Sequence, residues 1–507
     1  MIDTVATAGV EADHLSIEHL RPKIESRAVS GGLVSGLAQG SQLVLTLAYT
    51  AVLARLLSPR DFGLVAMGTA VGGFLQVFKE AGLSTATIQR ENITHAQVSN
   101  LFWINLGVGG MASFTMAVSA PLIAWFFHQP ALTGITVALS ASFLFDALAV
   151  QHMALLNRQM QFKTISIVEV GSMAAGFLVG IAMAMRDWGY WSLVGATLST
   201  AALRVSAIWT VSQWRPQTPA RRSGTRPLVR FGADLTLVGV VYAVARGSDS
   251  LLIGRFLGSE AVGLYSRATA LLNRPIDRLI GPIYAVIVPV LSRLQTQPDR
   301  YRQAFLQVFE GLAIAGFIFA ALFLPLAHPT VSVILGQRWE AAASVFAALT
   351  VAAIYLPLST STSWLYTSQG RGRDLLITSV IGACVMIGSF IAGLPFGARG
   401  VAIAYSASGI LVQLPITCYV VGRCGPVSFL DLWRAFWRHV PVAVVVLTVT
   451  SLAALATAGL VPLVRLLVCL PVGLFAAGAC FLLFPQTRRT GARAVRMLSQ
   501  MRTQSNR

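Results

Sequence analysis

The stretch LLITSVIGACVMIGSFIAGLPFGA at residues 375–398 contains no Asp, Glu, Lys or Arg. A helix needs about 20 consecutive apolar residues to cross the hydrocarbon core of a bilayer, so this stretch is long enough for one membrane span. Further uncharged runs occur at 28–54, 92–145, 401–422, 439–464 and 466–487. The pattern predicts an all-α integral membrane protein.

The composition excludes an ordinary soluble enzyme. Of the 507 residues, 55% are apolar and 11% are charged, and the mean hydropathy is +0.69. A soluble protein carries roughly a quarter of its residues as Asp, Glu, Lys or Arg. The net charge of +18 would favour a nucleic-acid partner in a soluble protein, but no polar segment here is long enough to fold as a basic domain. We therefore expect no nucleic-acid partner.

About fourteen membrane spans account for the uncharged runs and the polar turns between them. We place them at 28–54, 62–83, 97–127, 131–156, 164–185, 188–212, 231–256, 261–292, 303–328, 341–366, 375–396, 399–421, 440–459 and 464–485. Lys and Arg are divided unequally between the two ends of these spans, with 26 at one end and about seven at the other. Positive residues accumulate on the cytoplasmic side, so we expect a multi-pass protein of the bacterial inner membrane with both termini in the cytoplasm.

The expected organisation has seven parts. They are a cytosolic leader at 1–27, an N-lobe of six spans at 28–212, a basic cytosolic linker at 213–230, a C-lobe of six spans at 231–422, an interfacial amphipathic helix at 423–439, two further spans at 440–485 and a basic cytosolic tail at 486–507. In the amphipathic segment, Asp431, Arg434 and Arg438 share one helical face, and the large apolar side chains lie on the other. The segment can equally be a plain connecting elbow.

Two similar segments indicate an internal duplication. LARLLSPRDFGLVA at 53–66 matches IGRFLGSEAVGLYS at 253–266 at four positions, including Arg55 and Arg255. A weaker match, offset by 211 residues, joins WGYWSLVGA at 188–196 to RGVAIAYSA at 399–407. An even number of spans in each repeat gives both lobes the same orientation and relates them by a pseudo-twofold axis along the membrane normal.

Arginines within the predicted spans are candidates for binding an anionic substrate. Ionisable groups cost about 2.5–3.5 kcal/mol each in a membrane helix, so they mark functional sites by default. Arg267, Arg274 and Arg278 are spaced to form one stripe on a helix. The guanidinium group suits phosphate because its planar fork binds two oxygens and keeps its charge when partly desolvated. The candidate pyrophosphate site comprises Arg204, Arg246, Asp249, Arg267, Arg274 and Arg278. Alternatively, pairs such as Arg246 with Asp249 are structural ion pairs.

Carboxylates within the spans are candidates for coupling to a proton or sodium gradient. They are Asp146, Glu169, Asp234 and Glu310. Each can equally be a neutral acid bonded to a neighbouring helix. The sequence has no phosphate-binding GK[ST] loop and no HExxH motif, so we expect neither an enzyme nor a cofactor or metal.

Several motifs resemble those of bacterial polysaccharide flippases of the multidrug/oligosaccharidyl-lipid/polysaccharide exporter superfamily, in the branch serving exopolysaccharide and O-antigen (lipopolysaccharide) assembly. They are ARLLSPRDFGLVAM (54–67), GLSTATIQRENIT (82–94), SNLFWINLGVG (99–109) and SDSLLIGRFLGSEAVGLYSRATALLNRPIDRLIGPI (248–283). The resemblance implies two six-helix lobes around a cavity that opens to each side in turn. It also implies that the substrate is an oligosaccharide on a polyprenyl pyrophosphate.

Two other functions stay open at this point. One is a secondary drug or cation exporter of the same superfamily, which would favour a carboxylate-rich cavity. The other is a membrane-embedded polysaccharide polymerase or ligase, which would favour a large periplasmic loop. The partners implied for the flippase are the lipid-linked oligosaccharide, membrane lipids, and a polymerase with its chain-length partner.

Overall fold

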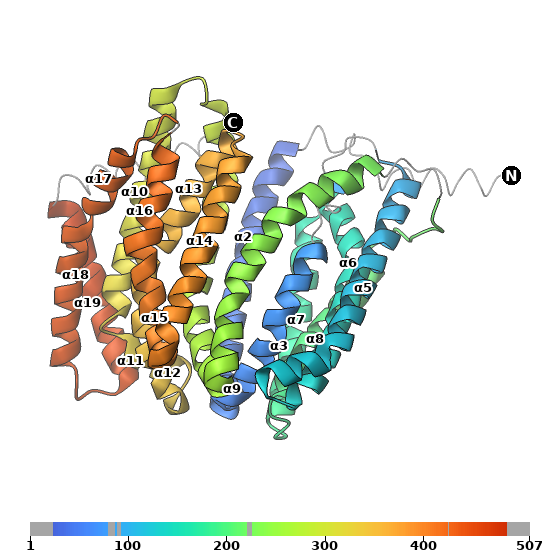
Figure 1. Ribbon diagram of the computed structural model, residues 1–507, viewed down its shortest axis with the longest axis horizontal. Helices are drawn as coiled ribbons and strands as arrows, with labels where there is room; N and C mark the ends of the chain where they lie inside the picture. The colour runs from blue at the N-terminus through green and yellow to red at the C-terminus, as the bar shows by residue number, and fades with distance from the viewer. Residues whose placement is uncertain (1–23, 80–86, 89–92, 221–225, 424, 484–507) are drawn as a thin grey trace. The chain divides into compact units, whose positions relative to one another are not determined.

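The computed structural model describes residues 24–79, 87–88, 93–220, 226–423 and 425–483, and every regular element in these ranges is a helix (Figure 1). The prediction of an all-α membrane protein is confirmed. The predicted basic tail at 486–507 and nearly all of the predicted leader at 1–27 lie outside the described residues.

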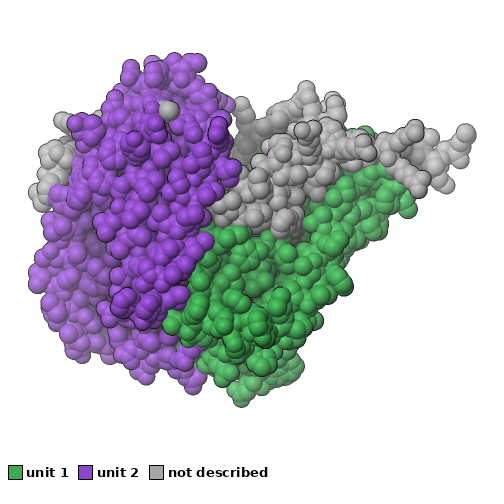
Figure 2. Space-filling view, in the orientation of Figure 1, with its two compact units in different colours: residues 1–259 green, residues 260–507 purple. Residues whose placement is uncertain are grey.

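The contacts divide the chain into two compact units, residues 1–259 and residues 260–507 (Figure 2). The helices of the first unit are α2 (Ile24–Leu56), α3 (Pro59–Lys79), α5 (His95–Phe127), α6 (Ala131–Arg158), α7 (Phe162–Ala184), α8 (Trp191–Val211) and the first part of α9 (Arg226–Arg293). Within this unit α5 packs along α6 and α7 packs along α8, while α2 contacts α7 and α3 contacts both α5 and α6.

The second unit begins with the remainder of α9. Its other helices are α10 (Pro298–Phe323), α11 (Ala327–Ile334), α12 (Glu340–Thr350), α13 (Leu356–Ser368), α14 (Gly372–Gly393), α15 (Gly397–Ser408), α16 (Leu414–Gly422), α17 (Phe429–Trp437), α18 (Val440–Ala456) and α19 (Pro462–Leu483). α14 packs along α15 and α18 along α19, and the last two helices join the unit through contacts with α10 and α11.

Eleven stretches of the described residues are long and apolar enough to cross a membrane. Gly372–Gly422 contains two of the spans predicted from the sequence, and Ala243–Arg293 contains the predicted span at 261–292 and the second half of the one at 231–256. The predicted second span at 62–83 corresponds to α3, which is not among the eleven. Every predicted span therefore has a helical counterpart, while the number fourteen stays a prediction.

Equivalent turns in the two halves support the internal duplication. Met160 and Gly370 both have left-handed backbone conformations, with φ of 55° and 69°, and they stand 210 residues apart. Each turn closes with the same type of hydrogen bond, from Gln161 N to Leu156 O at 3.0 Å and from Arg371 N to Tyr366 O at 2.9 Å. Asp187 and Gly397 repeat the relation at the next turn, with φ of 59° and 72° and the same separation. This offset is close to the 211 residues found in the sequence.

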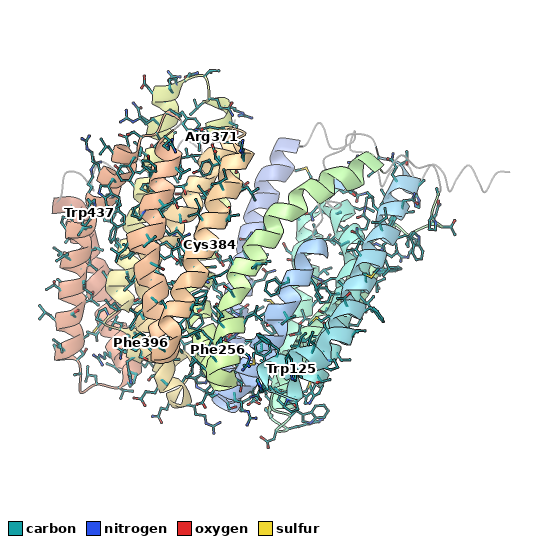
Figure 3. The ribbon with its side chains drawn as sticks, viewed as in Figure 1. Trp125, Phe256, Arg371, Cys384, Phe396 and Trp437 are labelled. Atoms are coloured by element: carbon teal, nitrogen blue, oxygen red, sulfur yellow. The ribbon has the colours of Figure 1, made fainter. Side chains whose placement is uncertain are left out.

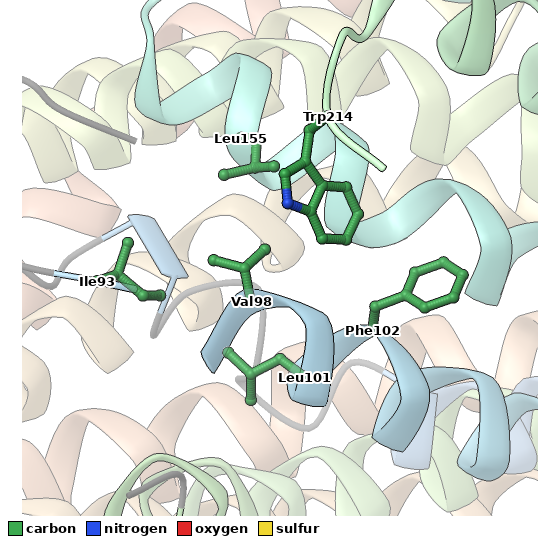
Figure 4. Packing of buried hydrophobic residues seen from close by; sticks show 6 residues of the cluster. All are labelled: Ile93, Val98, Leu101, Phe102, Leu155 and Trp214. Carbon is green, nitrogen blue, oxygen red and sulfur yellow. The ribbon is translucent and has the colours of Figure 1, made fainter. Parts of the chain in front are cut away.

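Hydrogen bonds and apolar contacts hold the start of the predicted linker at 213–230 against α5. Asn100 exchanges two hydrogen bonds with Ala220, donating from Nδ2 to the carbonyl at 2.7 Å and accepting at Oδ1 from the amide at 2.8 Å. Trp103 Nε1 donates to the Gln217 carbonyl at 2.8 Å. Trp214 is 4% exposed and completes the cluster in Figure 4, together with Ile93, Val98, Leu101, Phe102 and Leu155. Residues 213–220 therefore belong to the packed part of the first unit.

The first part of α9 packs against the first unit, although the sequence assigns it to the C-lobe at 231–422. A Cβ atom on Gly254 would lie 2.7 Å from Phe127 Cε1, and one on Gly247 would lie 3.2 Å from Phe74 Cζ. The glycines let α9 approach α3 and α5 closely, which explains why the contacts divide the chain after Ser259. Gly258, with φ of 85°, forms the turn between the predicted spans at 231–256 and 261–292. The predicted lobe boundaries themselves stay a prediction.

Two spans of the second unit are interrupted. The predicted span at 341–366 consists of α12, a 3-10 turn at Val351–Ile354 and α13. Pro357, in the first turn of α13, lacks the N–H that would continue the helical hydrogen bonding. The predicted span at 399–421 contains a π segment at Gly409–Gln413 between α15 and α16.

A close helix contact in the first unit depends on Gly176. A Cβ atom there would lie 2.0 Å from Thr200 Oγ1 and 2.8 Å from Thr200 N, so only glycine lets α7 approach α8 to this distance. Small residues serve the same purpose at other helix crossings in membranes.

We expect Gly176→Ala to lower the free energy of unfolding by about 1–3 kcal/mol, because the backbone of α8 must shift. Gly171→Ala on the same helix is the matched control, since nothing lies within 4 Å of the Cβ atom there. Thermal unfolding of the purified protein in detergent compares the two variants. Equal unfolding temperatures would contradict the packing.

Candidate functional site

The second part of α9 carries the predicted arginine stripe. Arg267, Arg274 and Arg278 are half-buried, and at about 100° per residue they fall within about 40° around the helix. Leu271, which falls beside Arg278 around the helix, is 8% exposed, and Ala268 and Leu272 are 0% and 1% exposed. The arginine stripe is therefore half-buried and lies next to packed apolar residues of the same helix.

This face has an excess of positive charge. Residues 261–280 contain three arginines and one carboxylate, Asp277, which is exposed. Arg274 and Arg278 lie one helical turn apart, close enough for their charges to interact. Like charges one turn apart repel each other, and an anion bound between them would relieve that repulsion.

The first part of α9 carries Arg246 and Asp249, which belong to the first unit. Arg246 is exposed and Asp249 is half-buried, and the charge of Arg246 acts on the carboxylate of Asp249. The Asp249 carboxylate also accepts a hydrogen bond from the backbone N–H of Ser250. Asp234 lies in the same helix, but its side chain is outside the described residues.

Arg204 and Asp146, which the sequence assigned to different roles, form an ion pair between α8 and α6. Their side chains are 31% and 14% exposed. Pairing offsets the cost of placing each charge in a membrane helix, so this contact favours a structural role for both. We therefore leave Arg204 out of the proposed pyrophosphate contacts and Asp146 out of the coupling site.

The other two carboxylates have different environments. Glu310 is 9% exposed and its Oε1 lies 2.6 Å from Arg438 Nη1, which joins α10 to the residue that follows α17. Glu169 on α7 instead accepts a hydrogen bond from the neutral amide of Gln42 on α2, at 3.2 Å. Glu310 thus has an arginine partner, whereas the hydrogen bond of Glu169 comes from a group that carries no charge.

The interrupted spans of the second unit meet in a cluster that sequence reasoning missed. A Cβ atom on Gly409 would lie 2.1 Å from Tyr355 Cε1, and the Tyr355 and Tyr405 rings are 5.8 Å apart. The hydroxyl groups of these tyrosines share a hydrogen bond. Pro357 and Pro415 were the available signal, because proline within a hydrophobic segment marks the discontinuous helices of transporters.

The described residues contain no group of three or more His, Cys, Asp or Glu that could hold a metal ion. Cys418, Cys469 and Cys480 are buried, and Cys384 is exposed on α14 (Figure 3). Cys424 lies outside the described residues.

Two units of packed membrane helices, with arginines on one helix face, define a two-lobe membrane transport protein. The fold is similar to that of the lipid II flippase MurJ in an inward closed conformation, with a TM-score of 0.70 and 14% sequence identity over 89% of this chain and 99% of that one. A family described as "Polysaccharide biosynthesis protein" matches residues 52–344. The chain belongs to this family, because the match covers more than half of its residues.

Two curated relatives match most of the chain. The lipopolysaccharide biosynthesis protein WzxC of Escherichia coli (strain K12) is 23% identical over 83% of this chain and 87% of its own length. The succinoglycan biosynthesis transport protein ExoT of Rhizobium meliloti (strain 1021) is 26% identical over 75% of this chain and 77% of its own length.

Proposed function

We propose that this protein is a flippase that moves oligosaccharide units, linked to a polyprenyl pyrophosphate, from the cytosolic to the periplasmic leaflet of the bacterial inner membrane. The family is one of polysaccharide biosynthesis, and a relative is named as a transport protein in that process. The fold is shared with a flippase of another lipid-linked precursor. The units would then pass to a polymerase and its chain-length partner.

The arginine stripe on α9 is the observation that carries this proposal. A pyrophosphate and its sugars must cross the bilayer shielded from hydrocarbon, whereas the lipid tail can stay in the membrane. Arg267 and Arg274 are half-buried on one stripe of the helix and would bind the phosphate oxygens. Arg246 and Asp249, on the first part of α9, are the further residues that would contact the pyrophosphate in a cycle that opens to each side of the membrane in turn.

The orientation of the protein in the membrane, with both termini in the cytoplasm, is part of the same proposal. The excess of Lys and Arg at one end of the spans supports cytoplasmic termini in the inner membrane. The protein would act by binding and conformational change, with no covalent chemistry of its own. The short loops between the described helices favour this over a polymerase or ligase, which needs a large periplasmic domain for its acceptor.

Glu169 is the carboxylate that we assign to proton or sodium coupling, because its described hydrogen bond comes from a neutral amide. Cation binding would neutralise the carboxylate and so change the strength of its hydrogen bond with Gln42. We expect Glu169→Gln to transport substrate at a rate that no longer changes when either ion gradient is collapsed. A variant that keeps the full gradient dependence of the unmodified protein would remove Glu169 from this role.

We expect Arg267→Ala and Arg274→Ala each to lower surface polysaccharide production at least about tenfold, because a charge-assisted phosphate contact is lost. Arg300→Ala is the control, since Arg300 is exposed and its side chain donates a hydrogen bond to the nearby Gln297 at 2.9 Å. Membrane levels measured by immunoblot must match the unmodified protein. Full polysaccharide yield in both stripe variants would contradict the site.

A deletion strain separates the function from its alternatives. A missing flippase leaves lipid-linked units on the cytosolic face of the membrane, whereas a missing polymerase leaves unpolymerised units on the periplasmic face. Loss of drug resistance, with normal polysaccharide, would instead indicate a drug exporter.

A further inference from the structure

α17 is a short helix at the end of the second unit where α16 ends and α18 begins (Figure 1). A capping box fixes its first turn: Ser428 Oγ accepts from Asp431 N at 3.3 Å, and the Asp431 carboxylate accepts from Ser428 N at 3.0 Å. α16 ends one stretch that is long and apolar enough to cross a membrane, Gly372–Gly422, and α17 begins the next, Phe429–Ala456, which continues through α18. α17 therefore lies where the chain leaves one span and enters the next.

Contacts with α10 hold α17 in a defined rotation about its own axis. Arg302 on α10 forms an ion pair with Asp431, and Glu310, two turns further along α10, pairs with Arg438. The Phe317 and Phe436 rings, 5.2 Å apart, pack between the same helices. These contacts engage both carboxylates, Asp431 and Glu310, at this interface.

The side of α17 opposite its buried residues Leu432, Ala435 and Phe436 exposes a stripe of mixed chemistry. Leu430 is 56% exposed and Trp437 is 53% exposed, and Arg434 is exposed between them. At about 100° per residue these three side chains fall within about 60° around the helix. Figure 3 shows Trp437 on the outer side of the second unit. A large aliphatic side chain, a guanidinium group and an indole therefore face outward together at the end of two membrane spans.

We propose that Leu430, Arg434 and Trp437 form a binding site for the headgroup of an anionic glycerophospholipid in the cytoplasmic leaflet. The Arg434 guanidinium would bind the lipid phosphate through two N–H groups. Trp437 would lie at the level of the headgroups, where indole rings concentrate, and Leu430 would contact the start of the acyl chains.

The combination of positive charge with exposed apolar side chains favours a lipid over a soluble phosphate or a protein. The two carboxylates at the base of the helix are engaged by Arg302 and Arg438, so the outward face presents positive charge. A soluble phosphate would gain nothing from the exposed leucine and tryptophan, whereas a lipid uses all three side chains. The surface lies at the membrane boundary, where anionic lipids are at high local concentration.

The test is lipid binding by the purified full-length protein in a neutral detergent, followed by native mass spectrometry. We expect phosphatidylglycerol to bind more tightly than phosphatidylcholine. Arg434→Gln should weaken phosphatidylglycerol binding about fivefold, the effect of one basic residue at a membrane surface, and leave phosphatidylcholine binding unchanged. Arg434→Lys keeps the charge but loses the planar fork, so it should weaken binding by a smaller factor.

Arg186→Gln is the matched control, because Arg186 is exposed in the turn between α7 and α8 of the other unit. It should bind phosphatidylglycerol as the unmodified protein does. Equal affinity of the unmodified protein for the two lipids would overturn the proposal. So would unchanged phosphatidylglycerol binding in both Arg434 variants, or displacement of the lipid by excess glycerol phosphate, which would indicate a soluble phosphate site.

Discussion

The cost of placing a polar group in hydrocarbon is the constraint on which this structure depends. It requires each spanning segment to satisfy its own backbone hydrogen bonds, and the described residues accordingly form helices. It also governs the side chains within the spans. Asp146 pairs with Arg204, and Glu310 pairs with Arg438. Each pair joins two helices, so compensating the charges also fixes how those helices pack.

The arginine stripe on α9 differs from these pairs in its position. Arg267, Arg274 and Arg278 lie half-buried along one stripe of a single helix, and three arginines accompany one carboxylate there. A positive surface at membrane depth is costly unless it meets water or an anion. We propose that a lipid-linked pyrophosphate supplies that anion, so the physical constraint that orders the fold would also select the substrate.

The spans and most turns could be predicted because bilayer thickness fixes the length of an apolar run. The interrupted helices were missed because Pro357 and Gly409 lie in uncharged runs whose hydropathy resembles that of a continuous helix, so only the prolines could have indicated them. The packing of residues 213–220 against α5 depends on hydrogen bonds between Asn100 and Ala220, which are 120 residues apart. The pairing of Arg204 with Asp146 spans 58 residues. Contacts at such separations leave no periodic signal, so the candidate site was predicted as a set of residues without its partners.

Translocation by the purified protein in proteoliposomes tests the central claim most directly. A polyprenyl-pyrophosphate oligosaccharide is placed in both leaflets, and a glycosidase added outside cleaves only the sugars exposed there. The account predicts that the cleaved fraction rises beyond its value in protein-free liposomes, because the protein brings inner-leaflet units to the outside. A cleaved fraction that stays at the protein-free value, with correctly folded protein in the membrane, would contradict it.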